Sequence, residues 1–142
     1  MQLRLTLPAL QAFVAEVFPQ VVERFEIVEL APCRAVVRMT AREDDLRPGG
    51  TVSGPAMFML ADCAFYMVTL AMIGPELLTV TTNCSIDFLR KPGPGGLTAE
   101  ARLLKLGRTL AVGDALIFSD GVEGPVARAG LTYSIPPRPS SP

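Results

Sequence analysis

The stretch AMFMLADCAFYMVTLAMI, from Ala56 to Ile73, decides the fold of this chain. It is long enough for about five helical turns, it is apolar on every side, and Asp62 is its only charged residue. No other charge occurs between Arg47 and Glu76. An ionised carboxylate is costly to bury without partners, and perturbed carboxylates in apolar surroundings concentrate at catalytic sites. Asp62 therefore has either a structural role inside the core or a functional one.

The ends of this helix are marked by glycine and proline. It is expected to open near Gly54-Pro55 and to close at Gly74-Pro75, because proline suits the first turn and glycine the position after the last. Its length approaches that of a membrane span. The central aspartate and the lack of a second span or flanking basic clusters favour a buried helix in a soluble domain instead. One sheet face cannot cover a helix that is apolar all round, so the sheet must curl around it or a second subunit must help.

Further elements are expected on both sides of this helix. A first helix begins near Pro8 and ends at Pro19, with apolar residues at helical spacing. Strand patterns then occur twice before the long helix and four times after it in meander-like succession, at residues 24–30, 34–40, 77–89, 97–106, 109–118 and 125–135. This order predicts an α+β domain over residues 1–136, with an antiparallel sheet and one central helix. Residues 137–142 are expected to be disordered.

The composition narrows the possible partners. The chain has 142 residues, of which 49% are hydrophobic and only 19% charged, so we expect another subunit to cover some apolar surface. The net charge is −1 with no basic patch, so nucleic acid is not an expected partner. The N-terminus lacks the apolar run and cleavage site of a signal peptide.

The most restrictive fact about chemistry is that the sequence has no histidine. That excludes Ser-His-Asp and Cys-His catalysis and ordinary histidine-based zinc sites. Cys33, Cys63 and Cys84 are widely spaced and form neither a disulfide framework nor a metal motif. We therefore expect no metal, and a cytoplasmic location fits best.

The start of the long helix could bind a developing negative charge. Its first N–H groups have no partner inside the helix, and oxyanion holes use such donors. The alternative is structural, because glycines before a helix often serve only to shape a loop. Asp62 follows Gly54 by eight residues, which is about 12 Å along a helix axis. One carbonyl cannot contact both from the same helix. A site that uses both residues therefore needs two antiparallel copies of the helix, facing each other across a dimer interface.

Hydroxyl groups follow in the next strand. Simple alternation places side chains 81, 83 and 85 on one face of that strand and 82 and 84 on the other. The polar residues of this strand are Thr79, Thr81, Thr82, Asn83 and Ser85, and the hydroxyls among them could hold the Asp62 carboxylate or a water molecule. Threonine is also common in strands for its β-propensity alone.

The segment GGTVSGPAMFMLADCAFYMV, residues 49–68, resembles the helix region of hotdog-fold acyl-CoA thioesterases of the phenylacetate-degradation group. In that family a His-Gly-Gly turn precedes a helix carrying Leu-Ala-Asp-x-Ala, which here is residues 60–64. TVTTNCSIDFLRKP, LTAEARLLKLGRTLAVGDALI and ARAGLTYSI extend the similarity over roughly residues 24–136. The resemblance implies a hotdog fold: a long central helix wrapped by a curved antiparallel sheet of five to six strands, here with an extra N-terminal helix. It also implies homodimers, often paired into tetramers.

The same resemblance implies roles for particular residues. Asp62 matches the catalytic acid, which acts as general base on water or as nucleophile on the thioester. Gly54 of the partner subunit matches the oxyanion donor, and Thr81 lies near a position that orients the water or nucleophile. Coenzyme A would be part of the substrate, with no separate cofactor. The substrate-binding residues suggested in this way are Ser53, Gly50, Asn83, Arg90, Lys91 and Arg108, and Lys105 is a further candidate for the phosphates.

Two departures from the family pattern leave an alternative open. Ser53 stands where histidine is common, and Pro55 stands in place of the second glycine. Pro55 has no N–H to donate, whereas that of Gly54 stays free; Ser53 can cap the helix or bond to the thioester region. A non-catalytic protein that binds acyl-CoA or a small ligand on the same fold is therefore the alternative to a thioesterase. A hydratase is less favoured, because such relatives typically use histidine.

Five residues could line an acyl pocket, although a place in the core is favoured for most of them: Met57, Phe58, Phe65, Tyr66 and Met67.

Overall fold

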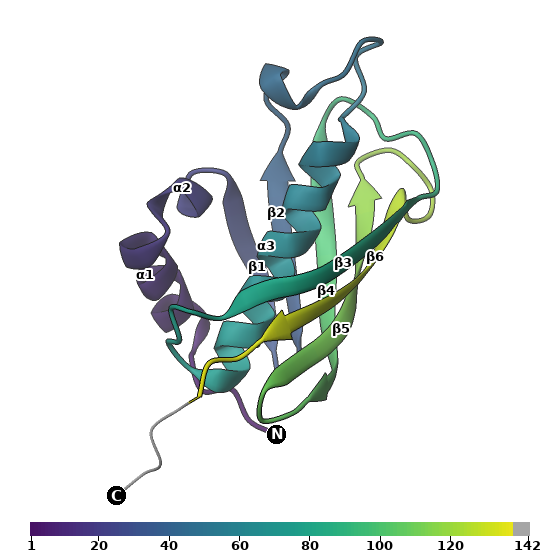
Figure 1. The fold of residues 1–142 in the computed structure, drawn as a ribbon. Coiled ribbons are helices and arrows are strands. Elements are labelled where there is room, and N and C mark those ends of the chain that lie inside the picture. The colour runs from purple at the N-terminus through teal and green to yellow at the C-terminus, as the bar shows by residue number, and fades with distance from the viewer. Residues whose placement is uncertain (138–142) are drawn as a thin grey trace, which may run out of the picture.

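A long helix, α3 (Gly54–Ile73), lies against a six-stranded antiparallel sheet that curves around it (Figure 1). The computed structural model describes residues 1–137. Apart from Pro137, the tail expected to be disordered at residues 137–142 lies outside that range. The other elements are α1 (Leu7–Val17), α2 (Pro19–Val22), β1 (Phe25–Ala31), β2 (Arg34–Thr40), a 3-10 turn (Glu43–Asp45), β3 (Val80–Phe88), β4 (Gly96–Leu106), β5 (Leu110–Ser119) and β6 (Ala127–Ser134).

The predicted ends of α3 are confirmed, and local chemistry explains both. Ser53 is the N-cap, and its side chain accepts a hydrogen bond from the Ala56 N–H at 3.3 Å. Pro55 lies in the first turn, where its missing N–H costs nothing. At the other end Gly74 has φ 96°, which favours glycine, and its N–H donates to the Leu70 carbonyl.

The sheet covers α3 because its inner face carries small side chains. By length and composition α3 could cross a membrane, but 72% of its apolar window is buried inside the protein. At Gly113 an added Cβ would lie 2.0 Å from the Arg102 carbonyl oxygen and 2.6 Å from the Phe65 ring, so no larger residue fits there. The prediction that the sheet curls around the helix is confirmed. The fully buried alanines of the sheet are Ala35, Ala99, Ala101, Ala111, Ala115, Ala127 and Ala129.

The order of strands differs from a simple meander. β4, β5 and β6 follow one another as predicted, but β3 lies at the sheet edge beyond β6, and β1–β2 joins the other side of β4. The prediction of four strands in meander-like succession is therefore wrong for β3. Alternating patterns identify strands but not their neighbours, and consecutive strands are adjacent only about two-thirds of the time.

The N-terminal helices pack beside β1 and α3. The first helix ends before Pro19 as predicted, and Pro19 then begins the short helix α2. Phe18 lies at the break, with φ −144° and ψ 62°. Its ring meets that of Tyr66 of α3 edge-on at 6.3 Å. The break therefore directs an aromatic side chain from the N-terminal segment toward the central helix.

A largely buried ion pair anchors the loop that precedes α3. The Arg24 guanidinium lies 2.5 Å from Asp45 Oδ2, which also accepts the Arg42 N–H at 2.8 Å. The Ser53 N–H donates to the Asp45 carbonyl at 2.7 Å. These bonds set where α3 begins.

Candidate active site

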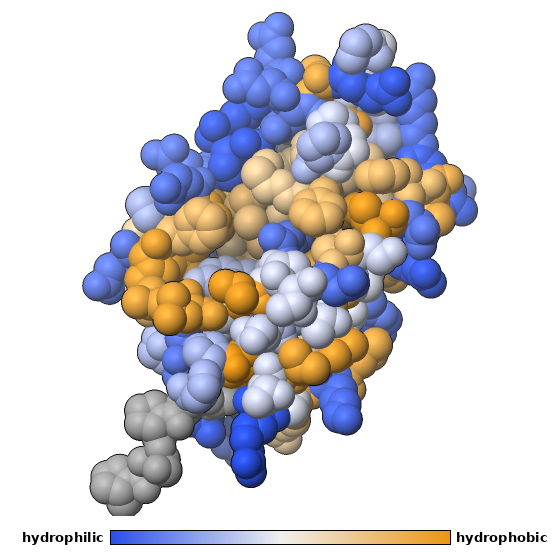
Figure 2. Space-filling model, viewed as in Figure 1, coloured by the Kyte–Doolittle hydropathy of each residue, from blue (hydrophilic) through white to orange (hydrophobic). Residues whose placement is uncertain are grey.

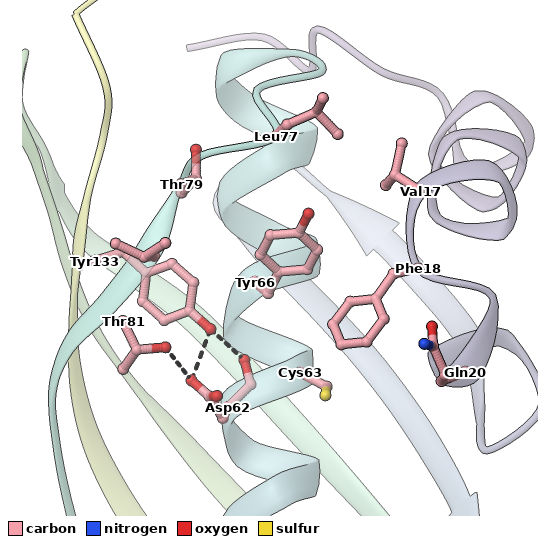
Figure 3. Close-up of a pocket in the computed structure, with 11 residues that line it drawn as sticks. Val17, Phe18, Gln20, Asp62, Cys63, Tyr66, Leu77, Thr79, Thr81 and Tyr133 are labelled. Atoms are coloured by element: carbon pink, nitrogen blue, oxygen red, sulfur yellow. Dashed lines mark hydrogen bonds between the residues drawn. The ribbon is translucent and has the colours of Figure 1, made fainter.

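Asp62 borders a cleft of about 590 Å³ between the middle of α3, the start of β3 and the α1–α2 break (Figure 3). Its side chain is partly buried. It is the only charged group among the lining residues, which are Val17, Phe18, Gln20, Asp62, Cys63, Tyr66, Leu77, Thr79, Val80, Thr81 and Tyr133. The cleft is therefore a mostly apolar space with one carboxylate in its wall.

Two hydroxyls hold this carboxylate. Thr81 Oγ1 donates to Asp62 Oδ1 at 2.7 Å. The Tyr133 hydroxyl lies 2.7 Å from the same Oδ1 and 2.7 Å from the Asp62 main-chain carbonyl oxygen (Figure 3). The expectation that a strand hydroxyl holds Asp62 is confirmed for Thr81, and the carboxylate has a defined orientation.

Sequence patterns did not single out Tyr133 as a functional residue. It belongs to the inward face of β6, which it shares with the apolar residues Ala127, Ala129 and Leu131. A tyrosine hydroxyl at a buried position normally needs a partner. A lone tyrosine on an otherwise apolar strand face was therefore the sequence feature that could have indicated a buried polar partner.

A bulge in β3 brings Thr81 onto the inner face. The β3–β6 register shifts between Thr81 and Asn83, so that Asn83 pairs with Thr132. Thr132 stands between Leu131 and Tyr133, which face the core, and Asn83 therefore points to the outer face. The expectation that positions 81, 83 and 85 share one face is wrong at 81, because the extra residue inverts the alternation. Substrate contact by Asn83 stays a prediction, and within one chain the side chain faces away from Asp62.

The other titratable groups around Asp62 remain protonated at neutral pH. Burial, and next the negative charge of Asp62, raise the pKa of Cys63 to about 12. The same two causes raise the pKa of Cys84 and, well above the ordinary range, the pKa of Tyr133. Neither thiol is a nucleophile in this state. Within residues 1–137, no group of three Cys, Asp or Glu side chains could hold a metal ion.

Gly54 borders a second cleft, of about 710 Å³, at the start of α3. Ser53 Oγ accepts a hydrogen bond from the Ala56 N–H, which confirms that Ser53 caps the helix. Pro55 has no N–H to donate. The N–H of Gly54 has no acceptor within its own helix. An added Cβ at Gly54 would lie 3.0 Å from the ring of Phe88. The start of α3 thus offers one backbone donor beside an aromatic ring.

The predicted basic residues fall into separate groups. Arg90 and Lys91 border the Gly54 cleft together with Arg47. Arg108 is exposed in the turn between β4 and β5. The neighbouring Gly107 lines a different cleft, with residues from the opposite end of α3. Arg108 lines neither the Gly54 cleft nor the cleft beside Asp62, and a phosphate contact by Arg108 stays a prediction.

Gly50 belongs to the loop before α3. It has φ 82°, a conformation that favours glycine, and its N–H donates to the Arg47 carbonyl at 3.0 Å. Its position in a tight exposed turn explains the glycine without a ligand. Contact between Gly50 and a substrate stays a prediction.

The candidate acyl-pocket residues divide between core and surface. Met57, Phe65 and Met67 are buried, which confirms the core prediction for them, although Met57 also borders the Gly54 cleft. Phe58 is partly exposed. Tyr66 lines the cleft beside Asp62.

A six-stranded antiparallel sheet wrapped around a long helix, with a carboxylate midway along that helix and facing a cleft, defines a hotdog-fold protein. A family model described as the thioesterase superfamily matches residues 49–125. The chain belongs to this superfamily.

Solved structures support the same assignment. A protein of a Silicibacter species, provisionally called a thioesterase, is 56% identical, with 96% of each chain covered and a TM-score of 0.89. A single-site variant of the phenylacetic acid degradation protein PaaI of Thermus thermophilus is 28% identical, covering 88% of this chain and 99% of that one, with a TM-score of 0.70. A Streptococcus mutans protein bound to acetyl-CoA is 24% identical, covering 81% and 90%, with a TM-score of 0.71. Comparison with curated proteins gave no significant match.

Proposed function

We propose that this protein is an acyl-CoA thioesterase in which Asp62 acts on the thioester, as general base toward water or as nucleophile. One observation carries the proposal: a single carboxylate, oriented by two hydroxyls at 2.7 Å, borders an otherwise uncharged cleft. A positioned base of this kind contributes about 10²–10⁴-fold to a rate. Thr81 serves to hold the carboxylate, and through it the water or the attacking oxygen.

The Gly54 N–H is the proposed oxyanion donor, supplied by a second subunit. Gly54 and Asp62 border different clefts of one chain and are about 12 Å apart along the helix. Two antiparallel copies of α3 would bring the Gly54 of one chain to the Asp62 of the other. A preorganised donor at this point is worth on the order of 10²–10³-fold.

The edge strand β3 is the proposed seam between the two subunits. One side of β3 pairs with β6, and the other side is the open edge of the sheet. Apolar side chains gather on the face that β3 crosses (Figure 2), and Leu77, Val80 and Phe88 are each more than half exposed. An open edge with apolar side chains is a ready surface for a second strand. A dimer formed here can pair further into a tetramer.

Coenzyme A is proposed to bind at the start of α3. Arg47, Arg90 and Lys91 border the Gly54 cleft, and cations are suited to phosphate groups. The similar Streptococcus mutans protein bound to acetyl-CoA supports a ligand of this class. Coenzyme A is then part of the substrate and no separate cofactor is needed. Three free thiols, Cys33, Cys63 and Cys84, fit the reducing cytoplasm that we propose as the location.

The cleft beside Asp62 is proposed to hold the acyl group. Phe18, Tyr66 and Leu77 supply apolar surface to a space of about 590 Å³. Apolar clefts of this size with a few polar groups are typical small-ligand sites. The thioester carbonyl would then lie between Asp62 and the donor from the partner subunit.

A binding protein without hydrolysis is the second candidate. Ser53 stands where the family pattern has histidine, and Pro55 has no N–H to donate, so the oxyanion site has fewer backbone donors than the family pattern. On this view the protein binds acyl-CoA and releases it unchanged.

Thiol release across short, medium, long-chain and aryl acyl-CoAs distinguishes these candidates. The thioesterase should hydrolyse at least one of them, and Asp62→Asn should lower kcat by about 10²–10⁴-fold while the thermal midpoint stays close to wild type. Asp44→Asn, an exposed acid-to-amide change in the loop before α3, is the matched control. Undiminished turnover by Asp62→Asn would contradict the assigned role. Acyl-CoA binding without thiol release would select the binding protein.

A further inference from the structure

We propose that Tyr133 is a positioning residue for Asp62: together with Thr81 it holds Oδ1, so that Oδ2 is the oxygen that reacts. The inference rests on the proposed function of Asp62 and extends it to a residue of β6, outside the segment that matches the family model.

The geometry distinguishes the two carboxylate oxygens. Oδ1 receives both Thr81 Oγ1 and the Tyr133 hydroxyl at 2.7 Å. Within residues 1–137, no hydrogen bond reaches Oδ2. Hydrogen bonds to one oxygen of a carboxylate fix its plane and leave the lone pairs of the other free for water or a carbonyl carbon. Oδ2 is therefore the oxygen available to accept a proton or to attack.

The Tyr133 ring itself is held in place. Tyr133 is 2% exposed, and its ring packs edge-on against Phe65 at 5.1 Å and tilted against Tyr66 at 6.4 Å. Because the hydroxyl also lies 2.7 Å from the main-chain carbonyl oxygen of Asp62, it bridges the backbone and the side chain of one residue. This arrangement restricts rotation of the Asp62 side chain more than a bond from the exposed strand position of Thr81 can do alone.

Tyr133 acts as a donor and not as an acid or base. Burial is the main cause that raises the pKa of this phenol far above its ordinary value, and the neighbouring negative charge of Asp62 adds to it. The O–H is thus present at every working pH. Of its two possible acceptors the charged carboxylate oxygen forms the stronger bond.

The other titratable groups near Asp62 carry no charge that could pair with it, so the hydroxyls of Thr81 and Tyr133 are its side-chain partners within residues 1–137. From α3 come Cys63 and Tyr66, from β3 Cys84, and from β6 Tyr133, and burial raises the pKa of all four. All four are neutral in the physiological range. No ion pair recorded within residues 1–137 involves Asp62.

Packing alone does not explain the hydroxyl. The other inward side chains of β6 are apolar, and phenylalanine would fill the same volume against Phe65 without bringing a polar group into the core. A buried hydroxyl contributes only when it is bonded. Here its partner is the one carboxylate of the cleft.

Removal of the hydroxyl tests the inference. Tyr133→Phe keeps the ring, and Thr81→Val keeps the branched shape of the strand residue. The control is Thr69→Val, on the same helix as Asp62, because the Thr69 hydroxyl is fully buried and has no hydrogen-bond partner within residues 1–137. For each variant, kcat and KM on the best acyl-CoA, the thermal midpoint and the ¹³C NMR titration of the Asp62 carboxyl carbon are measured.

We expect Tyr133→Phe to lower kcat by on the order of 10–100-fold, because the free energy of a hydrogen bond to a charged group corresponds to a rate change of this size. KM should change by less than about twofold. The carboxyl titration should move to higher pH, because a donor to the charged form is lost. The Thr81→Val, Tyr133→Phe double variant should lose less than the product of the two single effects. Thr69→Val should keep the wild-type kcat and titration.

Two other results would overturn the inference. One is wild-type kcat and an unmoved titration in Tyr133→Phe; the other is a loss of kcat that only follows the loss of folded protein. If the wild type releases no thiol from any thioester, the proposed function fails instead. The carboxyl titration needs no substrate, so it still decides whether Tyr133 holds Asp62.

Discussion

The Asp62 carboxylate is tolerated in an apolar helix because it leaves the core at the wall of a cleft. Ala61 and Ala64 of the same helical turn are fully buried, whereas Asp62 is only partly buried and bonded to two hydroxyls. An ionised group with donors and access to solvent escapes most of the cost of burial. A structural role and the proposed functional role of Asp62 are therefore compatible, since the hydrogen bonds that stabilise its charge also fix the orientation of its carboxylate.

A second carboxylate, that of Asp45, is buried too, and it is stabilised by the opposite charge of Arg24. Arg24 and Asp45 are mostly buried, so we expect Arg24→Met to destabilise the protein by about 2–4 kcal/mol by leaving the Asp45 charge unpaired. Chemical denaturation measures this loss. Arg34→Met is the control, because Arg34 pairs at the surface with Glu29 and such pairs contribute about 0–1 kcal/mol. Equal losses in the two variants would contradict the role given to burial.

At the scale of elements, the break between α1 and α2 determines what faces the cleft. Pro19 cannot continue α1, so the chain turns at Phe18 and restarts as α2. Val17, Phe18 and Gln20 then border the cleft beside Asp62. These residues precede the segment that matches the family model. Under the proposed function, this wall is where we expect selectivity among acyl groups to be determined.

Phe18→Ala tests this wall. We expect kcat/KM for aryl and medium-chain acyl-CoAs to fall by about tenfold, since apolar contacts with a ring are worth 1–3 kcal/mol, while the value for acetyl-CoA changes by less than about twofold. The ratio of the two values is the measurement. Val22→Ala, which changes an exposed apolar residue of α2 outside this cleft, should leave the ratio unchanged. A parallel fall for all substrates would contradict a role in selectivity.

For the whole molecule, the separation of the two clefts makes assembly of two chains a requirement of the proposed chemistry. Asp62 and Gly54 cannot serve one carbonyl within a chain, and the open edge of β3 is where a second chain can pair. Each dimer would then hold two equivalent sites, and each site would take Asp62 from one chain and Gly54 from the other.

Mixing two inactive variants tests the shared site. Asp62→Asn removes the carboxylate, and Gly54→Pro removes the N–H while Ser53, at φ −75° and ψ 158°, already has the conformation preferred before proline. With random pairing of co-expressed chains, half of the dimers are mixed and each has one intact site. We expect about a quarter of wild-type thiol release per chain, where each variant alone has almost none.

Gly54→Ala is the control for the mixing experiment. It keeps the N–H and adds only a Cβ close to the exposed Phe88 ring, so it should lose less activity than Gly54→Pro. Absence of recovered activity, in a sample shown by mass to contain mixed dimers, would contradict a site shared between chains.

The sequence by itself determined the elements and the principal residue. Glycine and proline marked both ends of α3, alternation marked the strands, and a lone charge in an apolar helix marked Asp62. These signals are local, because they depend on residues within one or two turns of each other. The resemblance over residues 24–136 added the hotdog fold and the thioesterase superfamily, both of which hold for this chain.

Only the tertiary structure decided which residues meet Asp62. Tyr133 lies 71 positions away along the chain, and it reaches the helix because β6 pairs with β3 at the edge of the sheet. Thr81 faces inward because of a bulge that simple alternation does not foresee. Strand neighbours and registers depend on how the whole sheet closes around α3, and no local pattern carries that information. The sequence could therefore indicate the carboxylate, whereas the fold determined the hydroxyls that orient it.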